Sequence, residues 1–198
     1  EVARLPAPNS WSMLMDEANS PIKYPDMCRT LVIDTADWAE RLCIDHICSK
    51  ANVKGLEDFG YGKGYQYLAE EYGRLLNLLT EVTNKGVHVV LAAHAAMRKF
   101  EQPDELGQYD RWELKLQKKV ASLVKEWANV LLFANYKTYV VNVDNQGAQK
   151  GKNKAQGGRR VMYTTHHPCW DAKNRWGLPD ETDFSYSVIA PFIESSKP

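Results

Sequence analysis

The sequence has few cysteines, no excess of charge of either sign and no long hydrophobic run. Four cysteines in 198 residues are too few for the disulfide framework of a small secreted domain. The longest apolar stretch, residues 87–97, is about half of what a membrane-spanning helix needs, and it contains two histidines. No segment has the charged start, apolar middle and small-residue cleavage site of a secretory signal. We therefore expect a protein without a membrane span in a reducing cytoplasm.

Acidic and basic residues are balanced, with 25 of each and a net charge of zero. With 44% hydrophobic residues the composition is that of an ordinary globular protein, which excludes a disordered chain. The balance also means that any contact with nucleic acid must come from a local patch, because the chain as a whole is not basic. A length of 198 residues predicts one domain over residues 1–198.

Apolar residues recur at two different spacings along the chain. Helical spacing predicts helices over residues 11–18, 37–49, 65–84 and 114–127. Short β-branched and apolar runs predict strands over residues 30–35, 87–93 and 130–136. Residues 139–143 and 160–164 predict the arms of an antiparallel hairpin around a basic tip. This order indicates an α/β fold with a mostly parallel sheet flanked by helices and an antiparallel β-hairpin extension at its C-terminal side.

Two further segments are predicted to be irregular. Residues 98–111 are charged and have too little apolar content for a core element, so we expect an exposed loop there. Residues 60–65, Gly-Tyr-Gly-Lys-Gly-Tyr, have the composition of a phosphate-binding glycine loop but fail its spacing. Glu57 stands where a Walker A loop needs its first glycine, and Gly64 stands where it needs serine or threonine. We therefore interpret these residues as a turn that leads into a helix.

Asp34 and His94 stand at the carboxyl ends of the two predicted parallel strands. In open α/β sheets ligands bind beyond these strand ends, so both residues are candidates for a binding site. An acid in the place of Asp34 can hold Mg²⁺ through a water molecule, as the Walker B acid of a P-loop ATPase does. Taken alone, Asp34 could equally be an ordinary strand end, and His94 a polar residue satisfied within the core. The pair together favours a nucleotide site.

Lys173 and Arg175 are two cations separated by one residue, beyond the predicted hairpin. In an extended segment their side chains would project toward the same side. Such a pair could clamp a γ-phosphate in the manner of an arginine finger, a role often supplied by a neighbouring subunit. The alternative is a pair of solvated charges.

Two basic segments are candidates for binding nucleic acid, because single strands need phosphate neutralisation together with base stacking. The first segment mixes cations with aromatic residues, namely Arg98, Lys99, Tyr109, Arg111 and Trp112. Its acidic residues cancel this charge, so a solvated loop is an equal alternative there. The second segment is the tip of the predicted hairpin, which contains Lys150, Lys152, Lys154, Arg159 and Arg160. The tip is the better electrostatic candidate.

Taken together, these segments resemble a known family. The matching parts are residues 30–35, residues 58–65, the strand that ends in His94, the Tyr-Asp-Arg run at 109–111 and residues 172–179. Over residues 2–180 the chain resembles phage nucleotide-binding proteins of the AAA/RecA-like P-loop ATPase class, whose relatives include Sak-type single-strand annealing ATPases. The resemblance implies a RecA-like ATPase core that uses ATP and Mg²⁺.

The resemblance also assigns roles to individual residues. It implies that Asp34 is the Walker B acid, which holds Mg²⁺ through water, and that Thr35 lies beside the nucleotide. It implies that His94 is a polar sensor that couples the γ-phosphate to the DNA-binding loop that follows. Lys173 and Arg175 resemble a Lys-x-Arg finger that acts in the site of a neighbouring subunit.

The chain departs from the family at its start. The family's Walker A loop and catalytic glutamate precede the part that matches residues 2–11, so we expect a P-loop segment upstream of Glu1, and we do not expect residues 1–198 alone to hydrolyse ATP. The leading prediction is an ATP-dependent phage protein for single-stranded DNA binding, annealing or recombination. Its expected partners are single-stranded DNA, further copies of the chain and a single-strand binding protein. The alternative is a non-catalytic DNA-binding or interaction module that keeps the RecA-like fold without a P-loop.

Overall fold

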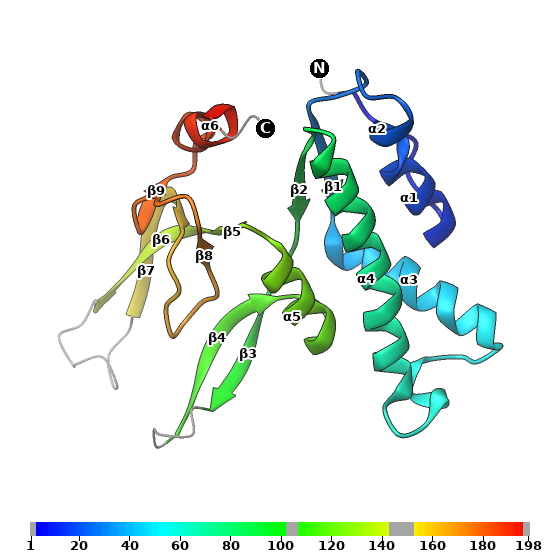
Figure 1. Cartoon of the computed structure of the whole chain (residues 1–198). Coiled ribbons are helices and arrows are strands. Elements are labelled where there is room, and N and C mark those ends of the chain that lie inside the picture. The colour runs from blue at the N-terminus through cyan, green and yellow to red at the C-terminus, as the bar shows by residue number, and fades with distance from the viewer. Residues whose placement is uncertain (1–2, 102–106, 143–152, 196–198) are drawn as a thin grey trace. The chain divides into compact units, whose positions relative to one another are not determined.

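The computed structural model describes residues 3–101, 107–142 and 153–195 (Figure 1). The chain divides into two compact units, Glu1–Ala128 and Asn129–Ser196, and each unit is described below by itself. Both units combine helices and strands, so the predicted mixed α/β composition is confirmed. The prediction of one RecA-like core over the whole chain stays a prediction.

The first unit contains most of the helices. These are α1 (Trp11–Ala18), α2 (Ser20–Lys23), α3 (Ala36–Ala51), the short 3₁₀ helix η1 (Leu56–Phe59), α4 (Lys63–Asn84) and α5 (Lys118–Trp127). Its strands are β1 (Thr30–Asp34), β2 (His88–Ala92), β3 (Ala95–Glu101) and β4 (Gln108–Leu114). The helices predicted from apolar spacing are thus present, with shifts of a few residues at their ends.

Strands β1 and β2 form a parallel pair, in which Thr30 lies opposite His88 and Asp34 lies opposite Ala92. The sequence predicts a mostly parallel sheet. Among the described residues, only this two-stranded part of it is present. Helix α3 begins directly after β1, where the Thr35 hydroxyl accepts a hydrogen bond from the Trp38 amide at 3.4 Å. A threonine at this position satisfies an otherwise unpaired amide and so helps to fix where the helix begins.

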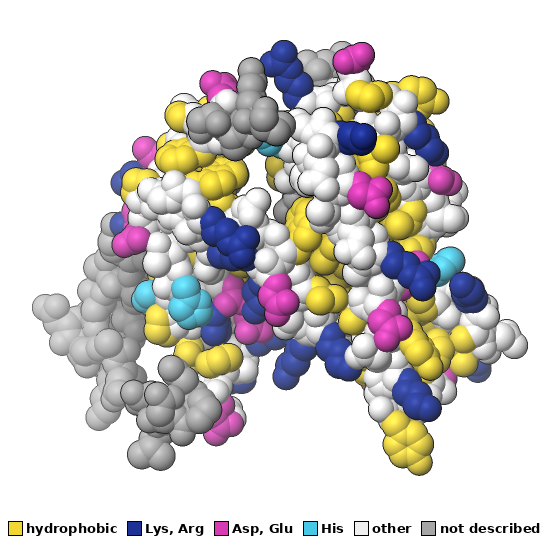
Figure 2. Space-filling model, in the orientation of Figure 1, with side chains coloured by type: hydrophobic (Ala, Val, Ile, Leu, Met, Phe, Trp, Pro, Cys, Tyr) yellow, Lys and Arg dark blue, Asp and Glu magenta, His cyan; other side chains and the backbone are white. Residues whose placement is uncertain are grey.

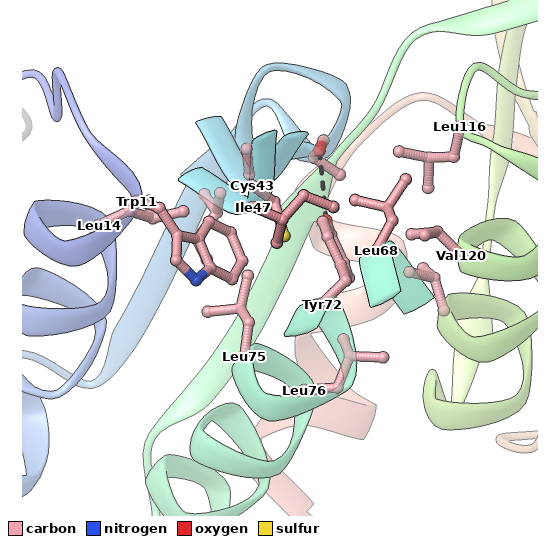
Figure 3. Packing of buried hydrophobic residues seen from close by; sticks show 14 of the residues in the cluster. Trp11, Leu14, Cys43, Ile47, Leu68, Tyr72, Leu75, Leu76, Leu116 and Val120 are labelled. Atoms are coloured by element: carbon pink, nitrogen blue, oxygen red, sulfur yellow. Dashed lines mark hydrogen bonds between the residues drawn. The ribbon is translucent and has the colours of Figure 1, made fainter. Parts of the chain in front are cut away.

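The core of this unit is built around α4. Leu68, Tyr72, Leu75 and Leu79 follow one another at helical spacing and are fully buried. They pack among side chains from α1, α3 and α5 (Figure 3). The Tyr72 hydroxyl donates a hydrogen bond to the Ala36 carbonyl at 3.2 Å (Figure 3). The core helix is therefore tied to the first residue of α3, just beyond the end of β1.

The glycine-rich segment 60–65 is a turn between η1 and α4, as the failed Walker A spacing predicted. Gly60 and Gly62 have φ angles of 70° and 69°, which glycine adopts without steric cost. A side chain at position 64 would approach the Leu56 carbonyl oxygen to 2.2 Å, so only glycine fits there. These glycines are explained by the turn itself.

The prediction of an exposed loop over residues 98–111 is wrong. Strands β3 and β4 form an antiparallel hairpin in this segment, with Arg98 opposite Arg111 and Phe100 opposite Tyr109. Exposed and half-buried residues alternate along β3. A two-stranded ribbon of this kind satisfies its backbone through the strand ladder, so it can form with little apolar content.

The second unit consists mainly of strands. They are β5 (Val130–Leu131), β6 (Phe133–Asn142), β7 (Asn153–Tyr163), β8 (Lys173–Asn174) and β9 (Glu181–Asp183), followed by helix α6 (Tyr186–Ser195). Strands β6 and β7 pair in antiparallel fashion, so the predicted hairpin is present, and β9 adds to the free side of β7. Strand β8 pairs with β5. No helix in the described ranges is long and apolar enough to span a bilayer.

The bond between Tyr72 and Ala36 predicts a measurable effect on stability. Tyr72→Phe removes the hydroxyl and leaves the buried Ala36 carbonyl without this donor, which should lower the free energy of unfolding by about 1 kcal/mol. Urea denaturation of both proteins measures the difference. Tyr24→Phe, at a side chain that is 65% exposed, is the matched control and should be neutral. Equal stability of Tyr72→Phe and the parent would show that this bond does not support the fold.

Candidate functional site

The ends of β1 and β2 meet at one edge of the parallel pair. Asp34 is the last residue of β1 and is exposed, whereas His94 follows the end of β2 by two residues. Because Asp34 lies opposite Ala92, the two strands end at the same level. The carboxyl ends of β1 and β2 are therefore neighbours. Thr35, which was predicted to contact nucleotide, uses its hydroxyl to cap α3.

His94 is held by Asp37, a residue of the first turn of α3. The His94 backbone amide donates to Asp37 Oδ1 at 3.2 Å, and its ring Nδ1 lies 3.0 and 3.1 Å from the two carboxylate oxygens. Burial raises the pKa of Asp37, but hydrogen bonds from the His94 amide, the Thr35 side chain and the His94 ring outweigh burial, so the pKa lies below its usual value. Asp37 is therefore an ionised, acceptor-only partner for His94.

A second carboxylate, Glu40, lies one turn further along α3. It is 7% exposed, and its Oε1 accepts a hydrogen bond from the Gln117 amide at 2.8 Å. Burial raises the pKa of Glu40 to about 7, although the Gln117 amide and the Arg98 guanidinium act in the opposite direction. The charge of Asp37 adds slightly to the rise. Glu40 is thus a buried carboxyl that changes its charge near neutral pH.

The backbone around His94 also closes the β3–β4 hairpin. The His94 carbonyl accepts a hydrogen bond from the Lys115 amide at 2.9 Å. This bond lies next to the first strand pair of the hairpin, Ala95 and Leu114. Arg98 of β3 donates from Nη2 to the Leu116 carbonyl at 2.8 Å and lies 3.9 Å from Glu113. Arg98, a predicted DNA contact, therefore ties β3 to the segment that follows β4.

Asp37 and Glu40 were not among the residues selected from the sequence. Their three-residue spacing places them on one face of α3, directly after the strand that ends in Asp34. That spacing is the only signal for them that the sequence contains. Their partners lie 57 and 77 residues away, so the tertiary structure was needed to find them.

The structure brings the first group of predicted nucleic-acid contacts together in the β3–β4 hairpin. Lys99 forms an ion pair with Asp110 at 3.0 Å, and the ring centroids of Phe100 and Tyr109 lie 5.5 Å apart. Arg111 is 7% exposed, and its guanidinium lies 4.8 Å from the Phe100 ring centroid. Trp112 is half-buried on the same strand. The hairpin thus presents aromatic rings and cations, with acidic side chains among them.

The second group is placed differently from what the sequence suggested. Lys150 and Lys152 lie outside the described residues, as does the side chain of Lys154 in β7. The placement of Arg159 and Arg160 at the hairpin tip is wrong, because both lie within strand β7, where Arg160 pairs with Tyr136 and Arg159 lies at a shift in the register. Arg159 donates from Nε and Nη2 to Asp183 at 2.8 and 2.6 Å, whereas the Arg160 guanidinium lies 5.5 Å from the Phe184 ring centroid.

Lys173 and Arg175 belong to the second unit. Lys173 is half-buried in β8, where it pairs with Leu131, and Arg175 is exposed and donates to the Asn129 side chain at 3.1 Å. Of the two predicted finger residues, only Arg175 is thus exposed. Asn174 between them organises the turn, since its Oδ1 accepts from the amides of Trp176 and Leu178, each at 3.1 Å. Sequence reasoning missed this asparagine.

A surface hollow of about 250 Å³ lies elsewhere in the first unit. It is bounded by the last turns of α3, the end of η1 and α4, and is lined by His46, Ile47, Lys50, Ala51, Phe59, Tyr67, Glu70, Glu71 and Arg74. Its nearest residue on α3, His46, is nine positions from Asp37, or roughly 14 Å along the helix axis. The hollow is therefore separate from the strand ends.

The chemistry at the strand ends suits a hard cation bound together with phosphate. Asp34 offers exposed carboxylate oxygens, and Mg²⁺ is usually held by one or two carboxylates together with phosphate oxygens and water. In the described part of the chain, no group of three or more His, Cys, Asp or Glu side chains could hold a metal by itself. Within these described residues, Asp34 would therefore supply only part of a metal's ligands. Acidic and basic side chains are interspersed over the face drawn in Figure 2, so charge alone selects no partner there.

Comparison with known proteins identifies the family. A family model described as an AAA domain matches residues 1–176. The chain belongs to this AAA domain family. Neither a search of curated proteins nor a search of solved structures finds a match. The matched residues include the ends of β1 and β2, the β3–β4 hairpin and the segment around Lys173 and Arg175. Membership of this AAA domain family indicates a nucleotide-dependent activity.

The raised pKa of Glu40 predicts how the stability of this AAA domain depends on pH. Because the folded pKa lies above the ordinary value of 4.5, folding favours the protonated carboxyl, and its contribution to stability is lost as the pH rises from about 4.5 to about 7. Glu40→Gln should remove this loss and stabilise the protein at pH 8, on the scale of about 1.4 kcal/mol for each unit of pKa shift.

Urea denaturation at a series of pH values measures the effect. Gln keeps an acceptor for the Gln117 amide, so the two proteins differ in the charge of the side chain at position 40. That charge interacts with Asp37, Arg98 and the Gln117 amide. Glu81→Gln, at an exposed carboxyl on α4, is the matched control. The assignment fails if Glu40→Gln and the parent lose stability in parallel over this pH range.

Proposed function

We propose that this AAA domain protein binds ATP with Mg²⁺ at the ends of β1 and β2 and uses it to control binding of single-stranded DNA. The reaction would be annealing or recombination of DNA strands, as in the phage proteins that the sequence resembles. The proposal rests on membership of the AAA family together with one geometric observation. His94 lies beside the strand end that carries Asp34, and its carbonyl also closes the β3–β4 hairpin.

At the nucleotide side, each residue has a separate task in this proposal. Asp34 holds Mg²⁺ through a water molecule, and Thr35 follows it as the residue that caps α3. Asp37 accepts at the Nδ1 of His94, so Nε2 is the ring nitrogen left to interact with a nucleotide. ATP bound with Mg²⁺ supplies the phosphoanhydride whose cleavage would drive the change in DNA affinity.

At the DNA side, the β3–β4 hairpin offers the groups that single strands require. The Phe100 and Tyr109 rings can stack bases, and Lys99 can neutralise a phosphate. Lys99 is paired with Asp110, but its side chain is 68% exposed, and an exposed ion pair contributes no more than about 1 kcal/mol. A DNA phosphate can therefore replace the carboxylate at little cost.

The larger assembly is also part of the proposal. Val32 and Val90 lie opposite one another in the parallel pair and are 54% and 44% exposed, although parallel sheets are normally covered on both faces. An uncovered face of this kind supports a further layer packed against the parallel pair, as the RecA-like fold implied by the resemblance would supply. Lys173 and Arg175 would then act as fingers toward the nucleotide of a neighbouring copy, and a single-strand binding protein would share the DNA substrate.

Replacement of Asp34 tests the nucleotide site. In the full-length protein, Asp34→Ala should abolish hydrolysis of ATP and leave the fold intact, because the exposed carboxylate contributes to metal binding and not to packing. Release of phosphate and circular dichroism measure the two effects. Asp45→Ala, at an exposed acid on α3, is the control and should retain full turnover. Unchanged turnover in Asp34→Ala would refute its role, and DNA binding by a parent that binds no ATP would favour the non-catalytic module.

The salt dependence of DNA binding tests the basic hairpin tip. Changing Lys150, Lys152 and Lys154 together to Ala should weaken binding of single-stranded DNA. The slope of log affinity against log salt should also fall by roughly 0.7 for each phosphate that the variant no longer neutralises. Fluorescence anisotropy at several salt concentrations measures the slope, with the exposed lysines Lys23, Lys50 and Lys85 changed together as the control. A slope equal to that of the parent would assign the DNA contacts to the β3–β4 hairpin instead.

A further inference from the structure

Two carboxylates of α3 hold the two ends of the β3–β4 hairpin. Asp37 accepts the backbone amide of His94, which immediately precedes β3, at 3.2 Å. Glu40 accepts the backbone amide of Gln117, three residues after the end of β4, at 2.8 Å. The two acids are three residues apart and lie on one face of the helix. One turn of α3 thus contacts both ends of the hairpin. We call these ends, His94 before β3 and residues 115–117 after β4, the root of the hairpin.

The root itself is closed by further bonds between these segments. The His94 carbonyl accepts from the Lys115 amide at 2.9 Å, and Arg98 donates to the Leu116 carbonyl at 2.8 Å. Leu116 is 2% exposed and belongs to the core of the first unit. The backbone of His94 is therefore hydrogen-bonded directly to the residue that follows β4.

Helix α3, which carries the two acids, is itself held in place by packing and hydrogen bonds at its first turn. Its first residue, Ala36, is fully buried and accepts the Tyr72 hydroxyl, and the Thr35 side chain caps its amide end. Both acids are less than a tenth exposed, so their positions are fixed by packing as well as by hydrogen bonds. Asp37 has a lowered pKa and is ionised, and a backbone amide bonded to a charged carboxylate is held more strongly than one bonded to a neutral group.

We propose that Asp37 and Glu40 are positioning residues that clamp the root of the β3–β4 hairpin and pass the state of His94 to it. The second part rests on the proposed function, because it requires a phosphate ligand at His94. A phosphate oxygen at Nε2 and the Asp37 carboxylate at Nδ1 would hold the two ring nitrogens from opposite sides, and so fix the ring and its backbone between them. The bond to Asp37 then tightens, and the hairpin is held in one orientation relative to α3.

Glu40 offers the cleaner test, since it contacts the hairpin root and not the His94 ring. Glu40→Ala removes the acceptor for the Gln117 amide, whereas Glu40→Gln retains an oxygen at the same position. Hydrogen exchange of the peptides 95–101 and 108–114, followed by mass spectrometry, reports the freedom of the hairpin. Peptides from α4 report whether the core remains folded, and Asp45→Ala is the control on the same helix.

Without nucleotide, Glu40→Ala should speed exchange of the hairpin about fivefold, the equivalent of the roughly 1 kcal/mol that one hydrogen bond contributes. Exchange in α4 should not change. Glu40→Gln and Asp45→Ala should behave as the parent does. Hairpin exchange in Glu40→Ala equal to that of the parent would overturn the clamp, whether or not the protein binds nucleotide.

With a slowly hydrolysed ATP analogue and Mg²⁺, exchange of the hairpin should slow in the full-length parent and in Glu40→Gln. In Glu40→Ala the analogue should still bind, as a direct titration shows, but the exchange of the hairpin should no longer respond. A response equal to that of the parent would overturn the role of Glu40 in transmission. Failure of the parent to bind the analogue would instead refute the proposed function, and the experiment without nucleotide would still decide whether the clamp exists.

Discussion

The hydrogen bonds between Asp37 and His94 connect the candidate nucleotide site at the strand ends to the β3–β4 hairpin. One carboxylate accepts both the backbone amide and the ring Nδ1 of the histidine, and it lies three residues after the strand-end acid Asp34. The end of β2, the start of α3 and the beginning of the β3–β4 hairpin are thereby fixed relative to one another. Breaking this link would separate the candidate metal ligand from the candidate DNA hairpin without removing either of them. The Asp37 side of the link is buried, whereas the His94 side chain is 58% exposed, so loss of these hydrogen bonds would leave the carboxylate with a desolvation cost.

Much of the fold could be predicted because its signals are local. The apolar spacing along α4 and the short β-branched run of β1 each reflect one element packing against the core, and both elements appear where they were expected. The strand ends at Asp34 and His94 follow from the same runs. The hairpin at residues 95–114 was missed because its strands stabilise one another by backbone pairing and carry charged residues on both faces. The partners of Asp37 and Glu40 were missed because tertiary contacts select them.

Ion pairs explain why a chain with no net charge still has candidate DNA contacts. Lys99 pairs with Asp110, and Arg159 pairs with Asp183, so each cation has a neighbouring acid. Both pairs are largely exposed, and such pairs add little to stability. Exchange of the carboxylate for another anion would therefore cost little at Lys99. Arg111 differs, because it is buried against Phe100 and supports the hairpin itself.

The most direct test of this account is a titration of the full-length protein with Mg²⁺ and ATP while the imidazole ¹⁵N signals of His94 are followed by NMR. The signals are assigned by their loss in His94→Gln. We expect Nδ1 to carry a proton before nucleotide is added, because Asp37 accepts from it, and the Nε2 signal to shift with the same saturation curve as nucleotide binding. Nucleotide binding that saturates while both His94 nitrogen signals stay unchanged would contradict it.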